Sequence, residues 1–248
     1  MRRILILIFI LVVSLCGYFF YHEKNQIQAV NREMFDKVMS EKMETLYVQA
    51  RNWKKPLQMT VSDDRLDGDY KVMSEVILQY WMDNIEARNS YLRQLDQAQW
   101  DEFLNAERLE KDRKGAYQQT YQMLNAVRKA TTEYEKKHAQ IFEKALVDVE
   151  GLNVDDKMRE AMKQKLLHSR EENDETALLQ IELQIIGKAE EMFSLLRQHQ
   201  WLRKGKTFLF AKDAQVRQFN VLYAEILEFQ AQIDELKRKN ANVFEVKD

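Results

Sequence analysis

Glu135 and His138 are the residues whose spacing comes nearest to that of a known metal site. In carboxylate-bridged di-iron bundles a Glu-x-x-His pair projects from one helix face, and a second such pair and two further Glu complete the site. The other histidines, His22, His168 and His199, have no Glu three positions before them. We therefore expect His138 to lie on a polar, solvated helix face, and we predict no metal ligands in the chain.

The acidic segment Asp63–Asp69 is a second candidate, because its pattern partly matches a calcium-binding loop. If Asp63 takes the first position of such a loop, Arg65 stands at the third position, where an oxygen ligand is needed, and Ser74 replaces the bidentate Glu. An acidic turn that caps the following helix fits these residues better.

Motifs for nucleophilic catalysis and phosphate binding are missing from the sequence. It contains no G-x-S-x-G elbow, no P-loop and no dinucleotide-binding fingerprint, and its one cysteine, Cys16, lies in an apolar run. We expect a protein that is not an enzyme, with no catalytic residues and no cofactor.

The apolar run Ile4–Tyr21 restricts where the rest of the chain is found. Its 18 residues carry no charge, and as a helix they span about 27 Å, close to the thickness of a bilayer's hydrocarbon core. Arg2 and Arg3 precede the run, so the positive-inside rule places only residues 1–3 in the cytoplasm and residues 22–248 in the periplasm. We predict a single-pass anchor in a bacterial inner membrane, with lipid contacts along the run at Ile4, Phe9, Val13, Tyr18, Phe20 and Tyr21.

Two alternatives to a retained anchor remain for the same apolar run. The chain is a lipoprotein if Cys16 is acylated, and it loses the run altogether if this is a cleaved secretory signal. Against a lipoprotein, Leu15 is bulkier than the small residue that usually precedes the cysteine. Against cleavage, an A-x-A-like site is missing, and the run ends on aromatic residues that favour the bilayer interface.

The composition of the exported part limits its partners. Residues 22–248 hold 36 Lys and Arg, which is the total of 38 less Arg2 and Arg3, against 40 Asp and Glu. Because these charges nearly cancel over the exported part as a whole, they do not favour binding to nucleic acid or to an anionic lipid surface. No Asn-x-Ser/Thr sequon occurs, which favours a bacterial envelope over a eukaryotic secretory compartment.

Long helices are predicted, because the 248 residues include only six Gly and one Pro. The fold class is all-α: a transmembrane helix, then an elongated antiparallel helical bundle with a small hairpin near residues 201–211. We divide the chain in sequence order into a cytoplasmic tip and anchor, a stalk or first bundle helix, a linker with the only Pro, and a helical bundle domain: 1–21, 22–55, 56–69 and 70–248.

Capping residues predict where the helices of the bundle begin and end. Asp69 is expected to cap a helix that ends near Leu95, Asp96 a short helix, and Asn153 the helix after Gly151. Between the last two, one uninterrupted helix is expected over residues 112–150, and a polar break at 170–175 precedes a helix over 176–200.

The hydrophobic period changes at residues 201–211, where two apolar patches flank a Lys-Gly-Lys turn and predict a hairpin. Its aromatic residues Trp201, Phe208 and Phe210 form either an interaction patch or a plug that closes the end of the bundle.

The final helix, over residues 212–239, has the most regular apolar pattern of the chain. Val216, Phe219, Tyr223 and Ile226 recur at alternating steps of three and four residues, with Leu222 beside them. A stripe of this width predicts a face buried in the bundle.

Two short motifs resemble those of a known group of proteins. They are L-D-x-x-Q-W-x-x-F at Leu95–Phe103 and W-x-x-x-G-x-x-x-L-F at Trp201–Phe210, behind a single N-terminal membrane signal. In this order they are similar to helical bacterial envelope proteins, often lipoproteins, grouped as domains of unknown function. The resemblance implies an envelope-facing helical domain and brings no catalytic residues.

We expect a membrane-anchored envelope protein whose extracytoplasmic bundle binds another envelope protein or has a structural role. The alternative is a periplasmic bundle that binds a small ligand and signals through a membrane partner. The sequence leaves the oligomeric state open.

Overall fold

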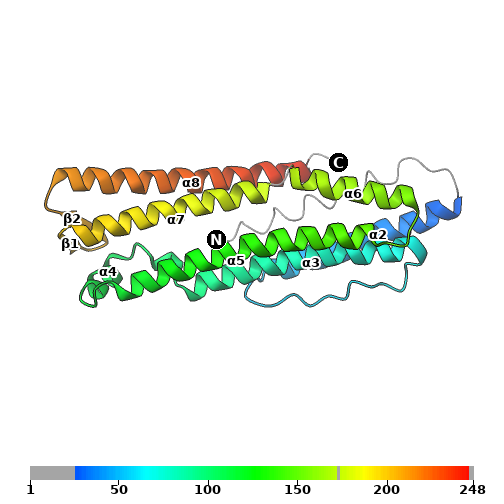
Figure 1. Ribbon diagram of the computed structural model, residues 1–248, viewed down its shortest axis with the longest axis horizontal. Helices are drawn as coiled ribbons and strands as arrows, with labels where there is room; N and C mark the ends of the chain where they lie inside the picture. Colours follow the sequence, from blue (N-terminus) through cyan, green and yellow to red (C-terminus); the bar gives the residue numbers. More distant parts are fainter. Residues whose placement is uncertain (1–25, 172–173, 246–248) are drawn as a thin grey trace. The chain divides into compact units, whose positions relative to one another are not determined.

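The computed structural model describes residues 26–171 and 174–245, and this part of the chain is mostly helical with one small sheet, as predicted (Figure 1). The elements in order are α2 (Gln26–Ala50), α3 (Gly68–Gln97), the single-turn 3-10 helix η2 (Trp100–Glu102), α4 (Ala106–Arg113), α5 (Gln118–Glu150), α6 (Asp156–Glu171), α7 (Asp174–Gln198), β1 (Trp201–Lys204), β2 (Thr207–Phe210) and α8 (Asp213–Glu245). None of the described helices is both long and apolar enough to cross a membrane, and the predicted anchor at residues 4–21 lies outside the described residues.

The described residues pack as two compact units whose boundaries fall inside α3, α5 and α8 and at the first residue of α7. Among these residues, unit 1 comprises 26–90, 136–171, 174 and 237–245, and unit 2 comprises 91–135 and 175–236. Each unit therefore combines segments that are distant in the sequence, whereas the sequence analysis divides the chain in sequence order.

Unit 1 has one large apolar core. The helix α2 lines it with side chains at three- and four-residue steps, of which Phe35, Val38 and Leu46 are almost completely buried. The other helices contribute Tyr70, Met73, Leu78, Trp81 and Ile85 from α3, Phe142, Ala145 and Val149 from α5, and Met162 and Leu166 from α6.

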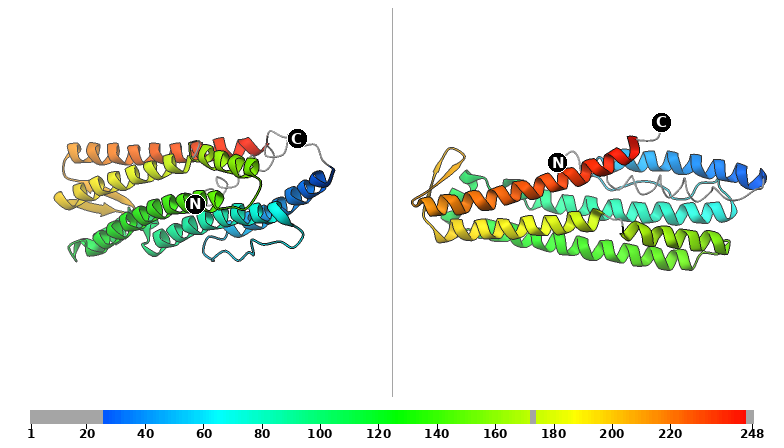
Figure 2. Two further views of the ribbon diagram at one scale, coloured as in Figure 1. Left: turned by 45° about the vertical axis from the view of Figure 1, so that its right-hand side comes forward. Right: turned by 90° about the horizontal axis from the view of Figure 1, so that it is seen from above.

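Unit 2 has a larger aromatic cluster and a smaller aliphatic one. Phe103, Tyr117, Phe193 and Trp201 belong to the larger cluster, whereas the smaller one joins α7 and α8 through Met192, Leu222 and Ile226. Within this unit α7 and α8 run side by side (Figures 1 and 2).

The predicted N-cap at Asp69 is wrong, because α3 begins one residue before it. The helix α3 begins at Gly68, whose N–H donates to Asp67 Oδ1 at 2.8 Å, so Asp69 already lies in the first turn. Its Oδ2 instead accepts a hydrogen bond from the backbone N–H of Asp155 at 3.1 Å. Neighbouring Asp residues are equally good caps, so the path of the loop decides which one is used.

Two other predicted caps are also wrong. Asp96 lies inside α3, which continues to Gln97. The helix α6 begins at Asp156, where Asp155 rather than Asn153 accepts hydrogen bonds from the next backbone N–H groups, at 2.9 and 3.4 Å.

The helix predicted over residues 112–150 is interrupted near its start. The helix α4 ends at Arg113 and α5 begins at Gln118, because Ala116 and Tyr117 adopt positive φ angles of 55° and 61°. Asp112 caps α5 from inside the preceding helix: its Oδ2 accepts the N–H of Thr120 at 2.8 Å and the hydroxyl of Thr120 at 2.7 Å. The other end agrees with the prediction, since α5 ends at Glu150, directly before Gly151.

The hairpin prediction is confirmed. The strands β1 and β2 pair antiparallel, with Trp201 opposite Phe210 and Lys204 opposite Thr207. Gly205 occupies the turn with a φ of 62°, a conformation that glycine adopts without steric cost.

Candidate functional site

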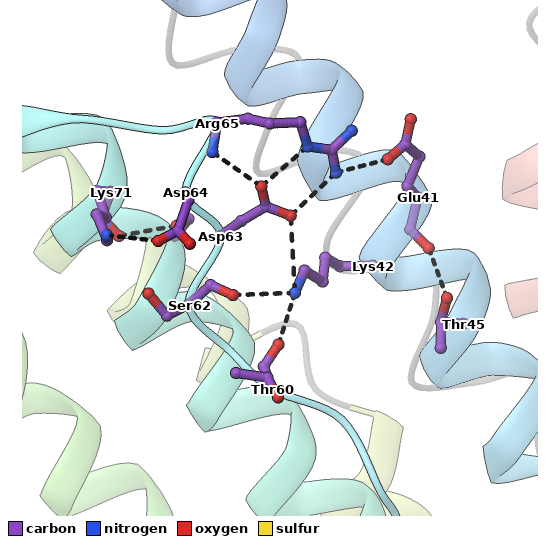
Figure 3. A network of polar contacts seen from close by, with 10 residues as sticks. Glu41, Lys42, Thr45, Thr60, Ser62, Asp63, Asp64, Arg65 and Lys71 are labelled. Atoms are coloured by element: carbon purple, nitrogen blue, oxygen red, sulfur yellow. Dashed lines mark hydrogen bonds and ion pairs between the residues drawn. The ribbon is translucent and has the colours of Figure 1, made fainter.

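The acidic turn after α2 is tied to that helix by charged side chains (Figure 3). Asp63 Oδ1 and Oδ2 accept hydrogen bonds from Arg65 Nε and Nη2, both at 2.9 Å, and Arg65 Nη2 also lies 2.7 Å from Glu41 Oε2. Lys42 Nζ donates to the backbone oxygens of Thr60 at 2.7 Å and Ser62 at 3.1 Å. Both carboxylate oxygens of Asp63 are engaged, so this turn is built as a clamp on α2.

The same contacts shift the pKa values of the two carboxylates. Hydrogen bonds from Arg65 hold the pKa of Asp63 well below its usual range, and they also lower the pKa of Glu41. Within the described residues, no group of three or more His, Cys, Asp and Glu is placed to hold a metal ion. On α5, Glu135 is exposed and His138 is half-buried.

A buried polar face on α3 is the first candidate site. In the part of the chain that the structure describes, the indole N–H of Trp81, Oδ1 of Asn84 and both amide atoms of Asn89 are buried without a hydrogen-bond partner. Asn84 Nδ2 donates to Tyr80 O at 2.8 Å. Buried polar atoms are usually satisfied, so these groups have hydrogen-bonding capacity for a water molecule or a small polar ligand.

A buried tyrosine in unit 2 has a structural role. The hydroxyl of Tyr91 lies 3.3 Å from Thr131 Oγ1, and the Tyr91 ring stacks on Tyr134 with centroids 5.0 Å apart. Burial, and to a smaller extent Glu182, raises the pKa of Tyr91, so the phenol stays protonated and serves as a hydrogen-bonding group.

The hairpin is fixed to unit 2 through Trp201. The indole N–H donates to Tyr117 Oη and to Leu196 O, both at 3.1 Å. Arg113 Nη1 donates to Trp201 O at 2.7 Å, and its guanidinium carbon lies 4.6 Å from the Trp201 ring centroid. These contacts give the hairpin a rigid base.

The three aromatic residues singled out by the sequence lie on the inner face of the hairpin. Trp201 is 2% exposed, and Phe208 and Phe210 are half-buried against Phe219 of α8, with centroid distances of 5.3 and 5.5 Å. These positions favour the plug over the interaction patch, because the three side chains pack at the end of the unit 2 core.

Sequence reasoning missed the exposed apolar pair on the other face of the hairpin. Leu202 and Leu209 are directly opposite each other across the strands and are 69% and 44% exposed. The alternation of side chains along a strand could have predicted this pair, because the residues next to the inward-facing Trp201 and Phe210 must face outward.

The predicted buried face of α8 is only partly buried. Among its described side chains only Leu222 and Ile226 are buried, whereas Val216, Tyr223 and Leu227 are exposed. These three are seven and four residues apart, so they follow one side of the helix and are here called the α8 stripe, whereas the exposed Val221 lies on the opposite side. The packing with α7 covers one flank of the apolar face and leaves the α8 stripe open.

Comparison with known proteins gives no relatives: no family model, no curated protein and no solved structure matches this chain.

Proposed function

We propose that this chain is a membrane-anchored protein of a bacterial envelope whose antiparallel helical bundle binds another envelope protein through the α8 stripe. The observation that carries the proposal is the row of exposed Val216, Tyr223 and Leu227 on one long helix. Contiguous exposed apolar side chains typically mark protein interaction sites, whereas single ones do not. The apolar run at residues 4–21 supports the anchor.

Rigidity favours the α8 stripe as a binding surface. Leu222 and Ile226 hold α8 against Met192 of α7, so binding on its other side needs no folding of the helix. An aromatic ring beside two aliphatic side chains is the kind of anchor that dominates protein interfaces.

Site-specific photo-crosslinking of the full chain in living bacteria tests this proposal. A photoreactive phenylalanine analogue placed at Tyr223 should give a protein adduct of defined mass, and the same analogue at Val147, an exposed apolar position on α5, should not. Absence of any protein adduct at Tyr223, or equal adducts at both positions, would count against the α8 stripe as an interface.

A second candidate function is binding of a small polar ligand in unit 1, and the buried polar atoms of Trp81, Asn84 and Asn89 favour it. A ligand that satisfies these atoms should come away with the purified full chain and be released by denaturation. Mass spectrometry of the released material should find one small molecule per chain, and Asn89→Leu should abolish its recovery. If no compound is released, the atoms are satisfied by water.

A further inference from the structure

The outer face of the hairpin combines apolar and basic side chains. The register and the alternation of the two strands place Leu202, Lys204, Thr207 and Leu209 together on this face, opposite the buried Trp201. We call these four residues the outer hairpin face.

The hairpin segment itself carries only basic charges, with the acidic Glu110 of α4 and Asp213 of α8 beside it. Residues 201–212 contain four basic residues and no acidic one, although the chain as a whole is slightly acidic. Arg203 Nε is paired with Glu110 Oε2 at 2.8 Å. Lys204, Lys206 and Lys212 are exposed and form no ion pair with any residue that the structure describes.

The hairpin that carries this surface is already rigid before binding. Trp201 is fixed by two hydrogen bonds through its indole and by a third that its carbonyl oxygen accepts from Arg113, and Phe208 packs on Phe219. Docking through the opposite face therefore orders little more than the lysine side chains, and this lowers the entropic cost of binding.

We propose that the outer hairpin face docks on the headgroups of an anionic phospholipid bilayer. Leu202 and Leu209 enter the boundary between headgroups and acyl chains, while the lysines extend their aliphatic stems along it and place their ammonium groups at the phosphates. Two leucines are too few for a stable protein interface, which covers about 800 Å² on each partner, but they suit a shallow membrane contact.

Such a contact is weak by itself and gains strength from tethering. A lysine near an anionic membrane surface raises partitioning roughly fivefold, so Lys204 and the neighbouring Lys206 of the turn give a modest affinity that salt weakens. The anchor in the proposed function makes this binding step intramolecular, which strengthens it when the hairpin reaches the bilayer. The inference therefore uses the proposed anchor and is independent of the α8 stripe.

Photo-crosslinking in vesicles tests the inference on the full chain. The photoreactive analogue is placed at Leu202 and, as a control of matched exposure, at Val147, since these residues are 69% and 67% exposed. In vesicles that contain phosphatidylglycerol, the Leu202 position should give an adduct with the added mass of one phospholipid, at a yield at least about fivefold above that in pure phosphatidylcholine. Combining it with Lys204→Gln and Lys206→Gln should lower the yield by a similar factor, and Val147 should give little adduct in either lipid.

Three results would overturn the inference. They are equal lipid adducts at the two positions, a yield at Leu202 that does not depend on lipid charge, and an adduct to an acidic protein in place of lipid in native membranes. Carbonate washing of the same vesicles reports on the anchor separately. A chain that resists washing but gives no lipid adduct at Leu202 keeps the proposed function and loses this inference.

Discussion

The first and last helices of the described chain have similar apolar patterns and different surroundings. The helix α2 buries six apolar side chains in the core of unit 1, and Val48 is its one large hydrophobic residue that stands well exposed among those described. Among its described side chains, the longer α8 buries only Leu222 and Ile226 and exposes the α8 stripe. A three-and-four periodicity predicts that a helix has an apolar face, but it does not predict what covers that face.

The two helices also differ in how their polar sides are held. The clamp of Lys42, Asp63 and Arg65 fixes a loop across α2, whereas the ion pair from Glu225 of α8 to Lys188 of α7, at 3.0 Å, lies on the flank already packed. The surroundings of α2 are typical of a helix with a structural role. The exposed apolar side of α8 is typical of a helix that binds another protein.

Removing one leucine from each helix gives the largest expected difference. Leu46→Ala creates a cavity in the unit 1 core and should lower the free energy of unfolding by about 3 kcal/mol, because Leu46 is completely buried. Leu227→Ala should change it by less than about 0.5 kcal/mol. Urea unfolding followed by circular dichroism measures both, and equal losses would show that α8 is covered within the chain.

The hairpin should show the same contrast between its two faces. Trp201→Phe removes the indole N–H that donates to Tyr117 Oη and Leu196 O, leaving only the 3.3 Å bond from the Tyr117 hydroxyl to Leu196 O, and should cost roughly 1–3 kcal/mol of unfolding free energy. Leu202→Ser on the outer face should cost less than about 0.5 kcal/mol. Thermal unfolding of the two variants side by side tests this, and a larger loss for Leu202→Ser would contradict the assignment of the faces.

Unit 2 has a polar cap as well as its apolar clusters. Asp112→Ala removes the acceptor of the Thr120 N–H and hydroxyl and should cost about 1–2 kcal/mol, more than an average surface substitution. Glu133→Ala, at an exposed position of α5, the helix that Asp112 caps, is the matched control. If both variants unfold at the same urea concentration, the turn before α5 does not need its cap.

The clamp on α2 predicts a small effect that depends on pH. The pKa of Asp63 is lower in the folded chain than its ordinary value of about 3.9, so the clamp stabilises the fold above that pH and loses this contribution as the pH falls through the folded pKa. Arg65→Met should therefore destabilise the chain at neutral pH, and the difference from the unchanged chain should shrink below about pH 4. The effect is small because Arg65 is 42% exposed. Urea unfolding at several pH values measures the stability difference between the two chains. If this difference does not change with pH, Asp63 is not its source.

Long regular features were predictable from the sequence, and local competition between similar residues was not. The scarcity of Gly and Pro predicted the helices, and the Lys-Gly-Lys turn between apolar patches predicted the hairpin. The starts of α3 and α6 were missed because several Asp residues lie within two positions of each helix start. The interruption before α5 was missed because positive φ angles at Ala116 and Tyr117 leave no composition signal.

The candidate surfaces needed the structure. The sequence identified the hairpin and left its aromatic residues as either an interaction patch or a plug, and the outward Leu202 and Leu209 follow only once the strand register is known. The α8 stripe has the same apolar residue types as a buried stripe, so only packing distinguishes the two.

Oxidative footprinting of the full chain in its native membrane tests the central claim, that a partner covers the α8 stripe. Tyr223 on this stripe and Tyr121 on α5 are 43% and 38% exposed, so the isolated chain should be oxidised by hydroxyl radicals at similar rates at both residues. In native membranes Tyr223 should be protected several-fold relative to Tyr121, and this protection should be lost on purification. Oxidation of Tyr223 as readily as Tyr121 in the membrane would contradict it.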